Sequence, residues 1–288
     1  MVPRAGCAPG AGPPGPAPGT EHYARHVAPS TPAHGTISLM LIYGINPVLE
    51  ALRTGRVSTI RIAARTDDRF AALLRVAGDK HVTITRVGSG ELDRLTRGGV
   101  HQGVVAELRE AKSVTVEDLI VQAMSSTSSL GSPGAPLIVV LDQIEDPQNV
   151  GAILRTVDAA GADGVVRQSR HAARLDGAAA KVSAGAVAHV KIAEVVNIAR
   201  ALEALKDAGV WTVGLAGDAP KRYDEIDLTL PTALVVGAEG TGLRRLVRDR
   251  CDWLVSIPMR GHVDSLNVSV ATGIALFEAL RQRARKAV

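Results

Sequence analysis

Residues 257–271 read Ile-Pro-Met-Arg-Gly-His-Val-Asp-Ser-Leu-Asn-Val-Ser-Val-Ala, and they mark a passage from a strand through a loop into a helix. The apolar run Trp253–Ile257 predicts the strand, which ends at Pro258. Ser265-Leu266-Asn267 then opens the helix, at a mouth where backbone N–H groups are free to bind a ligand. Taken alone, the segment favours a simple helix N-terminus, with Asn267 as cap and Ser265 as a loop residue. A ligand-binding loop is the alternative, and it gains support from the segments that accompany this one.

The helix predicted over Val268–Arg285 carries a periodic apolar face. Val270, Ile274 and Phe277 recur at i, i+4 and i+7, so we expect them to be buried on one side. A second stripe of small residues runs beside them, made of Ala271, Ala275 and Ala279. A single domain does not readily bury both stripes, and this predicts a homodimer through the carboxyl-terminal domain, with helices docked across a two-fold axis.

Strands and helices alternate through the carboxyl-terminal half of the chain, which predicts an α/β domain with a parallel sheet covered on both faces. The predicted strands are Leu137–Leu141, Gly164–Arg167, Trp211–Leu215, Leu234–Val236 and Trp253–Ile257. One predicted helix begins at Pro147. Three others cover Ile198–Ala208, Leu243–Asp249 and Val268–Arg285.

The amino-terminal half divides by composition. Residues 1–39 are rich in Gly, Pro and Ala and predict a disordered tail. Residues 40–112 predict a small α/β domain, whose first helix starts at Asn46 as cap and Pro47 as first helical residue. Residues 113–136 contain a short helical pattern and then a Ser- and Gly-rich run, which indicates a linker to a domain over residues 137–288.

Composition narrows the classes of function. The chain of 288 residues has 2% aromatic residues, too few for a base-stacking platform. Its net charge of +4 permits an RNA partner, and residues 40–112 hold 12 Lys or Arg against 8 Asp or Glu. Two cysteines, no secretory signal and no apolar run long enough to span a bilayer predict a cytoplasmic protein without a membrane partner. The eight histidines show no metal-like spacing, so we expect no metal.

Two further segments accompany the loop at 257–271. Residues 141–161 read Leu-Asp-Gln-Ile-Glu-Asp-Pro-Gln-Asn-Val-Gly-Ala-Ile-Leu-Arg-Thr-Val-Asp-Ala-Ala-Gly, and residues 233–243 read Ala-Leu-Val-Val-Gly-Ala-Glu-Gly-Thr-Gly-Leu. In order and spacing, the three resemble the signature motifs of the SpoU/TrmH branch of the SPOUT methyltransferases. The start at Met40-Leu-Ile-Tyr-Gly-Ile-Asn-Pro resembles the beginning of the family's substrate-binding domain. The runs Lys181-Val-Ser-Ala-Gly-Ala and Val195-Val-Asn-Ile-Ala-Arg-Ala-Leu resemble the subgroup that modifies a guanosine of 23S rRNA.

The resemblance implies a fold and an activity. It implies a SPOUT domain with a trefoil knot, preceded by a ribosomal L30e-like RNA-binding domain. It also implies transfer of a methyl group from S-adenosylmethionine to a ribose 2′-hydroxyl of RNA, with 23S rRNA rather than DNA as partner.

The resemblance further implies site residues. Asn149, Arg155, Glu239, Ser265 and Asn267 match the family's catalytic positions, and Glu239 is expected to orient Arg155 or the substrate. We expect Arg155 to bind phosphate and stabilise the developing alkoxide, because a guanidinium stays protonated in proteins. Cofactor contacts are expected at Leu215, Gly237, Ile257, Met259 and Leu266.

Three other functions stay open at this stage. The same chemistry could act on tRNA, or the chain could be a catalytically silent RNA-binding or ribosome assembly factor. An intact set of catalytic positions argues against a silent factor. The third is a nicotinamide-dependent oxidoreductase, against which the chain lacks the glycine fingerprint that such enzymes carry after their first strand.

Overall fold

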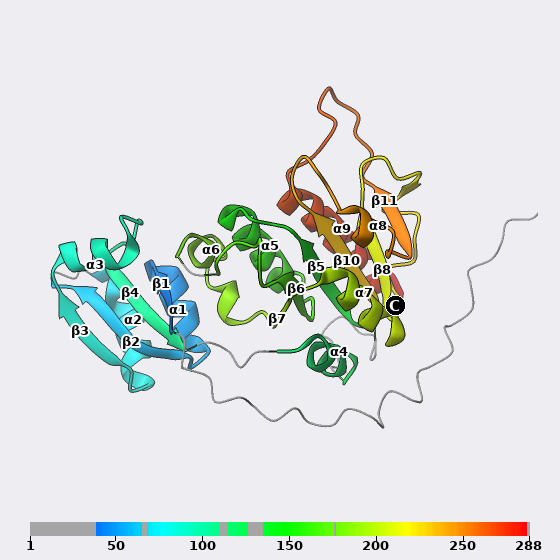
Figure 1. Ribbon diagram of the computed structural model, residues 1–288. Coiled ribbons are helices and arrows are strands. Elements are labelled where there is room, and N and C mark those ends of the chain that lie inside the picture. The colour runs from blue at the N-terminus through cyan, green and yellow to red at the C-terminus, as the bar shows by residue number, and fades with distance from the viewer. Residues whose placement is uncertain (1–38, 65–67, 110–113, 126–134, 176, 287–288) are drawn as a thin grey trace, which may run out of the picture.

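Two β-sheets at opposite ends of the molecule organise the chain in the computed structural model (Figure 1). The structure describes residues 39–64, 68–109, 114–125, 135–175 and 177–286. The tail predicted for residues 1–39 lies outside these ranges apart from Leu39, with which the first strand begins.

The smaller sheet has four strands in the order β1-β4-β2-β3, in which only β2 and β3 run parallel. Helices α1 and α2 pack on one face through Val48, Leu52 and Leu73, and α3 packs on the other through Leu92. This is the small α/β unit that the sequence predicts. Its elements are β1 (Leu39–Tyr43), α1 (Ile45–Arg53), β2 (Val57–Ala63), η2 (Asp68–Phe70), α2 (Ala71–Asp79), β3 (Thr83–Val87), α3 (Ser89–Thr96) and β4 (Val104–Arg109).

The first helix begins earlier than the sequence predicts. Its cap is Gly44, at φ 100°, and not Asn46. The reason is a tertiary contact, because the Gln102 side chain accepts a hydrogen bond from Ile45 N at 3.0 Å. A distant side chain therefore replaces the local cap that the pattern suggested.

The larger sheet has seven strands in the order β7-β6-β5-β10-β8-β11-β9, and neighbouring strands in it run parallel. Every residue of β5 is buried, as expected for a central strand with helices on both faces. The trefoil knot implied by the family resemblance stays a prediction. The elements are β5 (Leu137–Asp142), α5 (Pro147–Ala159), β6 (Gly164–Gln168), α6 (Gly177–Val182), η3 (Ala186–Ala188), β7 (Ile192–Val195), α7 (Ile198–Asp207), β8 (Trp211–Leu215), β9 (Lys221–Arg222), β10 (Thr232–Gly237), α8 (Arg245–Arg248), β11 (Trp253–Ser256) and α9 (Val268–Lys286).

Part of the predicted linker belongs to the core of the larger domain. Helix α4 (Val116–Ser125) buries Leu119 and Ile120 in the same apolar cluster as Leu202 of α7. Ser- and Gly-rich composition marks a linker only after this helix, in residues 126–134, which lie outside the described residues.

Helix α9 buries a different face from the predicted one. Leu276, Ala275 and Ala279 are buried against the sheet, whereas Val270 and Phe277 are 49% and 52% exposed. Ile274 is half-buried. The expectation that the Val270–Phe277 stripe is buried within this chain is therefore wrong, because the small side chains allow closer packing on the sheet.

The two domains meet where α6 packs on β1, the edge strand of the smaller sheet (Figure 1). The short helix η3 packs on α1 at the same boundary. Tyr43, at the end of β1, lies against Gly177, and the Arg56 guanidinium donates to the carbonyl of Ala188 at 3.0 Å. His189 lies 3.8 Å from the Glu50 carboxylate. The amino-terminal domain is thus docked beside α6, next to the helix that carries Asn149.

Candidate active site

A cavity of ~680 Å³ opens where the loops after β8, β10 and β11 meet the start of α9. All five residues predicted to contact the cofactor line it, and so do three of the five predicted catalytic residues. Ligands of parallel α/β sheets bind at this carboxyl edge of the strands. The cofactor-wall residues are Leu215, Gly237, Ile257, Met259 and Leu266, and the catalytic residues that line the cavity are Glu239, Ser265 and Asn267.

The Asn267 side chain links the first turn of α5 to the loop after β10 through its amide nitrogen. Its Nδ2 donates to Asn149 Oδ1 at 2.8 Å and to Glu239 Oε1 at 2.6 Å. Asn149 is 6% exposed in the first turn of α5, whereas Glu239 is exposed in the loop after β10. The three polar side chains predicted from separate motifs therefore form one hydrogen-bonded cluster at the cavity.

Asn267 also caps α9. Its Oδ1 accepts from Ser269 N at 2.9 Å and from the Ser269 hydroxyl. The two interpretations of this residue, a helix cap and a site residue, both hold, because the amide oxygen and the amide nitrogen serve different partners. The cap fixes the side chain so that its donors face Asn149 and Glu239.

The Glu239 loop requires glycine at one position. A Cβ on Gly237 would lie 2.2 Å from the carbonyl carbon of Gly242, a backbone atom that cannot move away cheaply. Gly242 N donates to Ala238 O at 2.8 Å, which closes the loop tightly. Glycine here serves the loop's close approach to its own backbone.

A buried ion pair supports this loop, and the sequence analysis did not identify it. Asp142, at the end of β5, is fully buried, and its carboxylate accepts from Arg244 N at 2.9 Å and from Arg244 Nε at 2.8 Å. Asp142 lies in the motif at residues 141–161, and its place in that motif could have indicated that it matters for the site. The pair ties the strand that leads to α5 to the loop that carries Glu239.

Asp218 and Arg248 line the same cavity and were also missed. The Arg248 guanidinium donates to both Asp218 oxygens at 2.9 Å. These hydrogen bonds hold the pKa of the Asp218 carboxyl below its usual range. The two residues are far apart in the sequence, and neither belongs to a local pattern, so the sequence did not predict the pair.

Two predicted catalytic residues lie outside the hydrogen-bonded cluster. Ser265 lines the cavity, but its hydroxyl donates to Asp264 at 3.2 Å. Arg155 is exposed on α5, about 9 Å along the helix axis from Asn149 by helical rise. Glu239 accepts from Asn267, and its expected role in orienting Arg155 or the substrate stays a prediction.

The described residues hold neither a metal-ligand cluster nor a membrane-spanning helix. No group of three or more His, Cys, Asp or Glu side chains there is placed to hold a metal ion. Nor does any helix in the described residues have the length and apolar character needed to cross a membrane.

Known families match nearly all of this architecture. The SpoU rRNA Methylase family matches residues 136–277, and a family described as RNA 2′-O ribose methyltransferase substrate binding matches residues 41–114. The first covers the larger sheet with the cavity, and the second covers the smaller sheet.

Similar proteins carry consistent names. The chain is 45% identical over 246 residues to the 23S rRNA (guanosine-2′-O-)-methyltransferase RlmB of Photobacterium profundum, covering 84% of this chain and 98% of that protein. It is 46% identical over 248 residues to RlmB of Pseudomonas syringae pv. tomato, covering 85% and 96%.

Among solved structures, the SpoU methyltransferase AviRb from Streptomyces viridochromogenes in complex with the cofactor AdoMet aligns with a TM-score of 0.69 and 27% identity, covering 85% of this chain and 90% of that one. An AdoMet-bound rRNA methyltransferase from Sinorhizobium meliloti aligns with a TM-score of 0.67 and 26% identity, covering 84% and 87%. The resemblance seen in the three motifs is confirmed over both domains. The chain belongs to the SpoU rRNA methylase family of S-adenosylmethionine-dependent RNA 2′-O-methyltransferases.

Proposed function

We propose that this protein transfers a methyl group from S-adenosylmethionine to the 2′-hydroxyl of a guanosine in 23S rRNA. The observation that carries the proposal is that the Asn149–Asn267–Glu239 cluster lies at the same cavity as the residues predicted to contact the cofactor. The RlmB proteins that it resembles are named for this reaction.

The cavity suits S-adenosylmethionine. Leu215, Ile257, Met259 and Leu266 offer apolar walls for an adenine ring, while Gly237 leaves backbone close to the ligand. When bound, the cofactor supplies a methyl group on a positively charged sulfur. The residues around it need only hold the RNA ribose in line with that methyl and help to remove the proton of the 2′-hydroxyl.

Each polar residue has a task that its chemistry allows. Asn149 and Asn267 orient Glu239 and offer amide groups to the ribose. Ser265 offers a hydroxyl at the cavity wall. Arg155 binds an RNA phosphate and stabilises the developing 2′-alkoxide, because its guanidinium remains charged.

We also propose that the protein is a homodimer through the larger domain. The exposed Val270 and Phe277 on α9 are apolar, and half-buried Ile274 lies between them along the helix. An apolar stripe of this kind favours a covering partner. Helix α5 packs on α9, so a second copy seated on the stripe also comes near Arg155 and brings an exposed guanidinium to a shared cleft.

The domains divide the work in this proposal. Residues 40–112 hold the RNA, and residues 137–288, with α4 packed into their core, carry catalysis in the cytoplasm. Light scattering of the full chain tests the dimer: Phe277→Asp should yield monomers with reduced methyl transfer. A wild-type monomer at micromolar concentration with full activity contradicts it.

Methyl transfer itself is tested with labelled S-adenosylmethionine and separate samples of 23S rRNA and tRNA. We expect label at one ribose of the 23S rRNA, located by mass spectrometry, and label only in tRNA would overturn the choice of substrate. Arg155→Ala should abolish transfer while calorimetry shows cofactor affinity within a few-fold. Leu266→Asp should weaken cofactor binding itself, by placing a charge against an apolar wall.

A further inference from the structure

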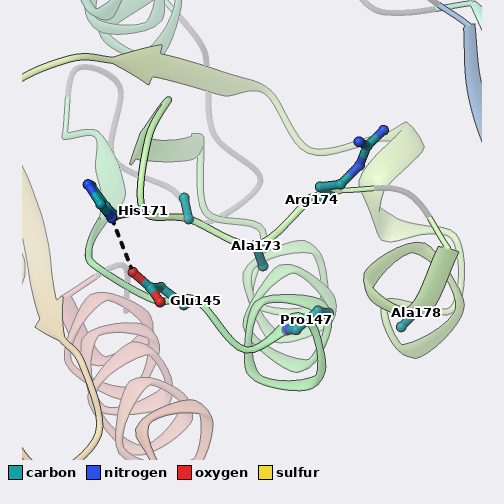
Figure 2. Close-up of a pocket in the computed structure, with 7 residues that line it drawn as sticks. Glu145, Pro147, His171, Ala173, Arg174 and Ala178 are labelled. Atoms are coloured by element: carbon teal, nitrogen blue, oxygen red, sulfur yellow. Dashed lines mark ion pairs between the residues drawn. The ribbon is translucent and has the colours of Figure 1, made fainter.

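A second groove, of ~540 Å³, lies beside the start of α5 and shares no lining residue with the cofactor cavity. Its walls come from the segment after β5, the segment after β6 and the start of α6 (Figure 2). Pro147 in its wall is two residues before Asn149 in the first turn of α5. The groove is therefore next to the catalytic cluster, at the same edge of the sheet.

The groove also faces toward the amino-terminal domain. Ala178 of α6 forms one end, and its neighbour Gly177 lies against Tyr43 of β1. Helix α6 packs on α5 on one side and on β1 on the other (Figure 1). The groove thus lies between the start of α5 and the helix that contacts the amino-terminal domain.

The lining has a small apolar floor and charged ends. Figure 2 shows Ala173 and Pro147 in the middle, the Glu145–His171 ion pair at one end and Arg174 at the other. His171 Nδ1 lies 3.7 Å from Glu145 Oε1. Small side chains leave the hollow open, and a volume of this size is in the range of small-ligand sites.

The loop after β6, which carries His171 and Arg174, is bound to the buried side chain of Arg167. The Arg167 guanidinium is 5% exposed and donates to the carbonyl of Ala173, in the groove floor. His171 adopts φ 51°, a left-handed conformation that a side chain rarely takes without support. The backbone of this loop is thus tied to β6 at Ala173, directly before the exposed Arg174.

We propose that this groove binds the ribonucleotide next to the methylated one, with its base over the Pro147–Ala173 floor and its phosphate at Arg174. The inference rests on the proposed function, since it assumes an RNA strand at the catalytic cluster. The chemistry is what single-stranded RNA offers: a flat base for an apolar surface and a phosphate for a guanidinium. Holding the neighbouring nucleotide fixes the ribose whose 2′-hydroxyl must be in line with the methyl donor.

Two variants test the groove in the full-length protein, with a 23S rRNA fragment as substrate. Arg174→Ala removes the phosphate contact, and Ala178→Trp fills the end of the groove. The matched control is Arg285→Ala, which removes an exposed charge near the end of α9 at the opposite edge of the sheet. Each protein is first checked for an unchanged melting temperature and cofactor affinity.

We expect KM for the RNA to rise about tenfold in Arg174→Ala, the effect of losing one charged hydrogen bond. The slope of log KM against log salt should also fall by about 0.7, the value for one phosphate contact to a single strand. A merely structural role for Arg174 would not change that slope. Ala178→Trp should raise KM with its salt slope unchanged, and Arg285→Ala should match the wild type.

A photocrosslink gives an independent reading. With 4-thiouridine placed next to the target nucleotide, we expect crosslinked peptides from residues 170–178. The inference is overturned if the wild type methylates the fragment while both groove variants keep its KM and salt slope. If the wild type instead fails to methylate any 23S rRNA, the proposed function fails, and that result is separate from the behaviour of the variants.

Discussion

Asp142 and Arg244 form the hydrogen-bonded ion pair that joins the central strand to the Glu239 loop: the buried carboxylate accepts from both the backbone N–H and the Nε of the arginine. Asp142 has no exposed surface, whereas the Arg244 side chain is 39% exposed. The aspartate thus depends on this one partner for compensation of its charge.

Removing the arginine should therefore cost more than removing both partners. We expect Arg244→Ala to lower the free energy of unfolding by about 2–3 kcal/mol, because it leaves a buried carboxylate uncompensated. The double variant Asp142→Asn/Arg244→Ala should recover part of that loss. Urea unfolding of the two variants and the wild type measures this, and a double variant less stable than Arg244→Ala would contradict the account.

An aspartate at position 267 should preserve the cap of helix α9 but disturb the cofactor site. Asn267→Asp keeps an oxygen for the cap of α9 and puts a carboxylate where Nδ2 now lies 2.6 Å from Glu239. Repulsion between the two carboxylates should open the loop and weaken cofactor binding at least tenfold. Calorimetry with S-adenosylmethionine measures this. Asn267→Ser, which lacks the second charge, is the matched control and should bind the cofactor more tightly than Asn267→Asp.

Gly237→Ala should disrupt the cofactor cavity, since its new methyl group would collide with the backbone of Gly242. We expect a loss of cofactor affinity of at least tenfold, with a fall in melting temperature of several degrees. Gly261→Ala is the matched control, because a Cβ at Gly261 meets nothing within 4 Å. Equal behaviour of the two variants in calorimetry and thermal melts would exclude the steric explanation.

Cys251 should resist alkylation in the folded protein. Burial raises the pKa of its thiol to about 12, so almost no thiolate is present near neutral pH. In a Cys7→Ser background, iodoacetamide at pH 8 should label the folded protein far more slowly than the urea-unfolded protein.

The same shift gives stability a pH dependence. The folded state holds the thiol proton more tightly than the unfolded state, whose value is near 9.0, so stability should fall as pH rises from about 9 toward 12. Comparison of the wild type with Cys251→Ala isolates this contribution, which should be absent in the variant. Rapid labelling of the native protein at pH 8 would show that the thiol is not buried in solution.

Local patterns predicted the parts of the fold that depend on local chemistry. Pro147 correctly indicated the start of α5, whose buried face includes Val150 and Val157. Patterns failed where a distant contact decides. Gln102 moved the cap of α1 to Gly44, and the close packing of α9 on the sheet exposed the larger side chains of its other stripe.

The site shows the same division. Its residue types could be taken from the motifs, but the hydrogen bond between Asn149 and Asn267 spans 118 positions of sequence. No periodicity measures such a distance. The Asp142–Arg244 pair escaped for the same reason, although Asp142 was quoted within a motif, because only the folded sheet shows that this carboxylate is buried.

The position of β10 between β5 and β8 has a consequence for how the molecule is made. Leu137 pairs with Thr232, so the fully buried strand β5 has no neighbour on one side until a chain segment far along the sequence arrives. Contacts at such separations close slowly, since a long loop must be ordered before pairing stabilises it. Until then, the apolar edge of β5 is open to other chains. Slow synthesis at low temperature should therefore raise the yield of soluble protein.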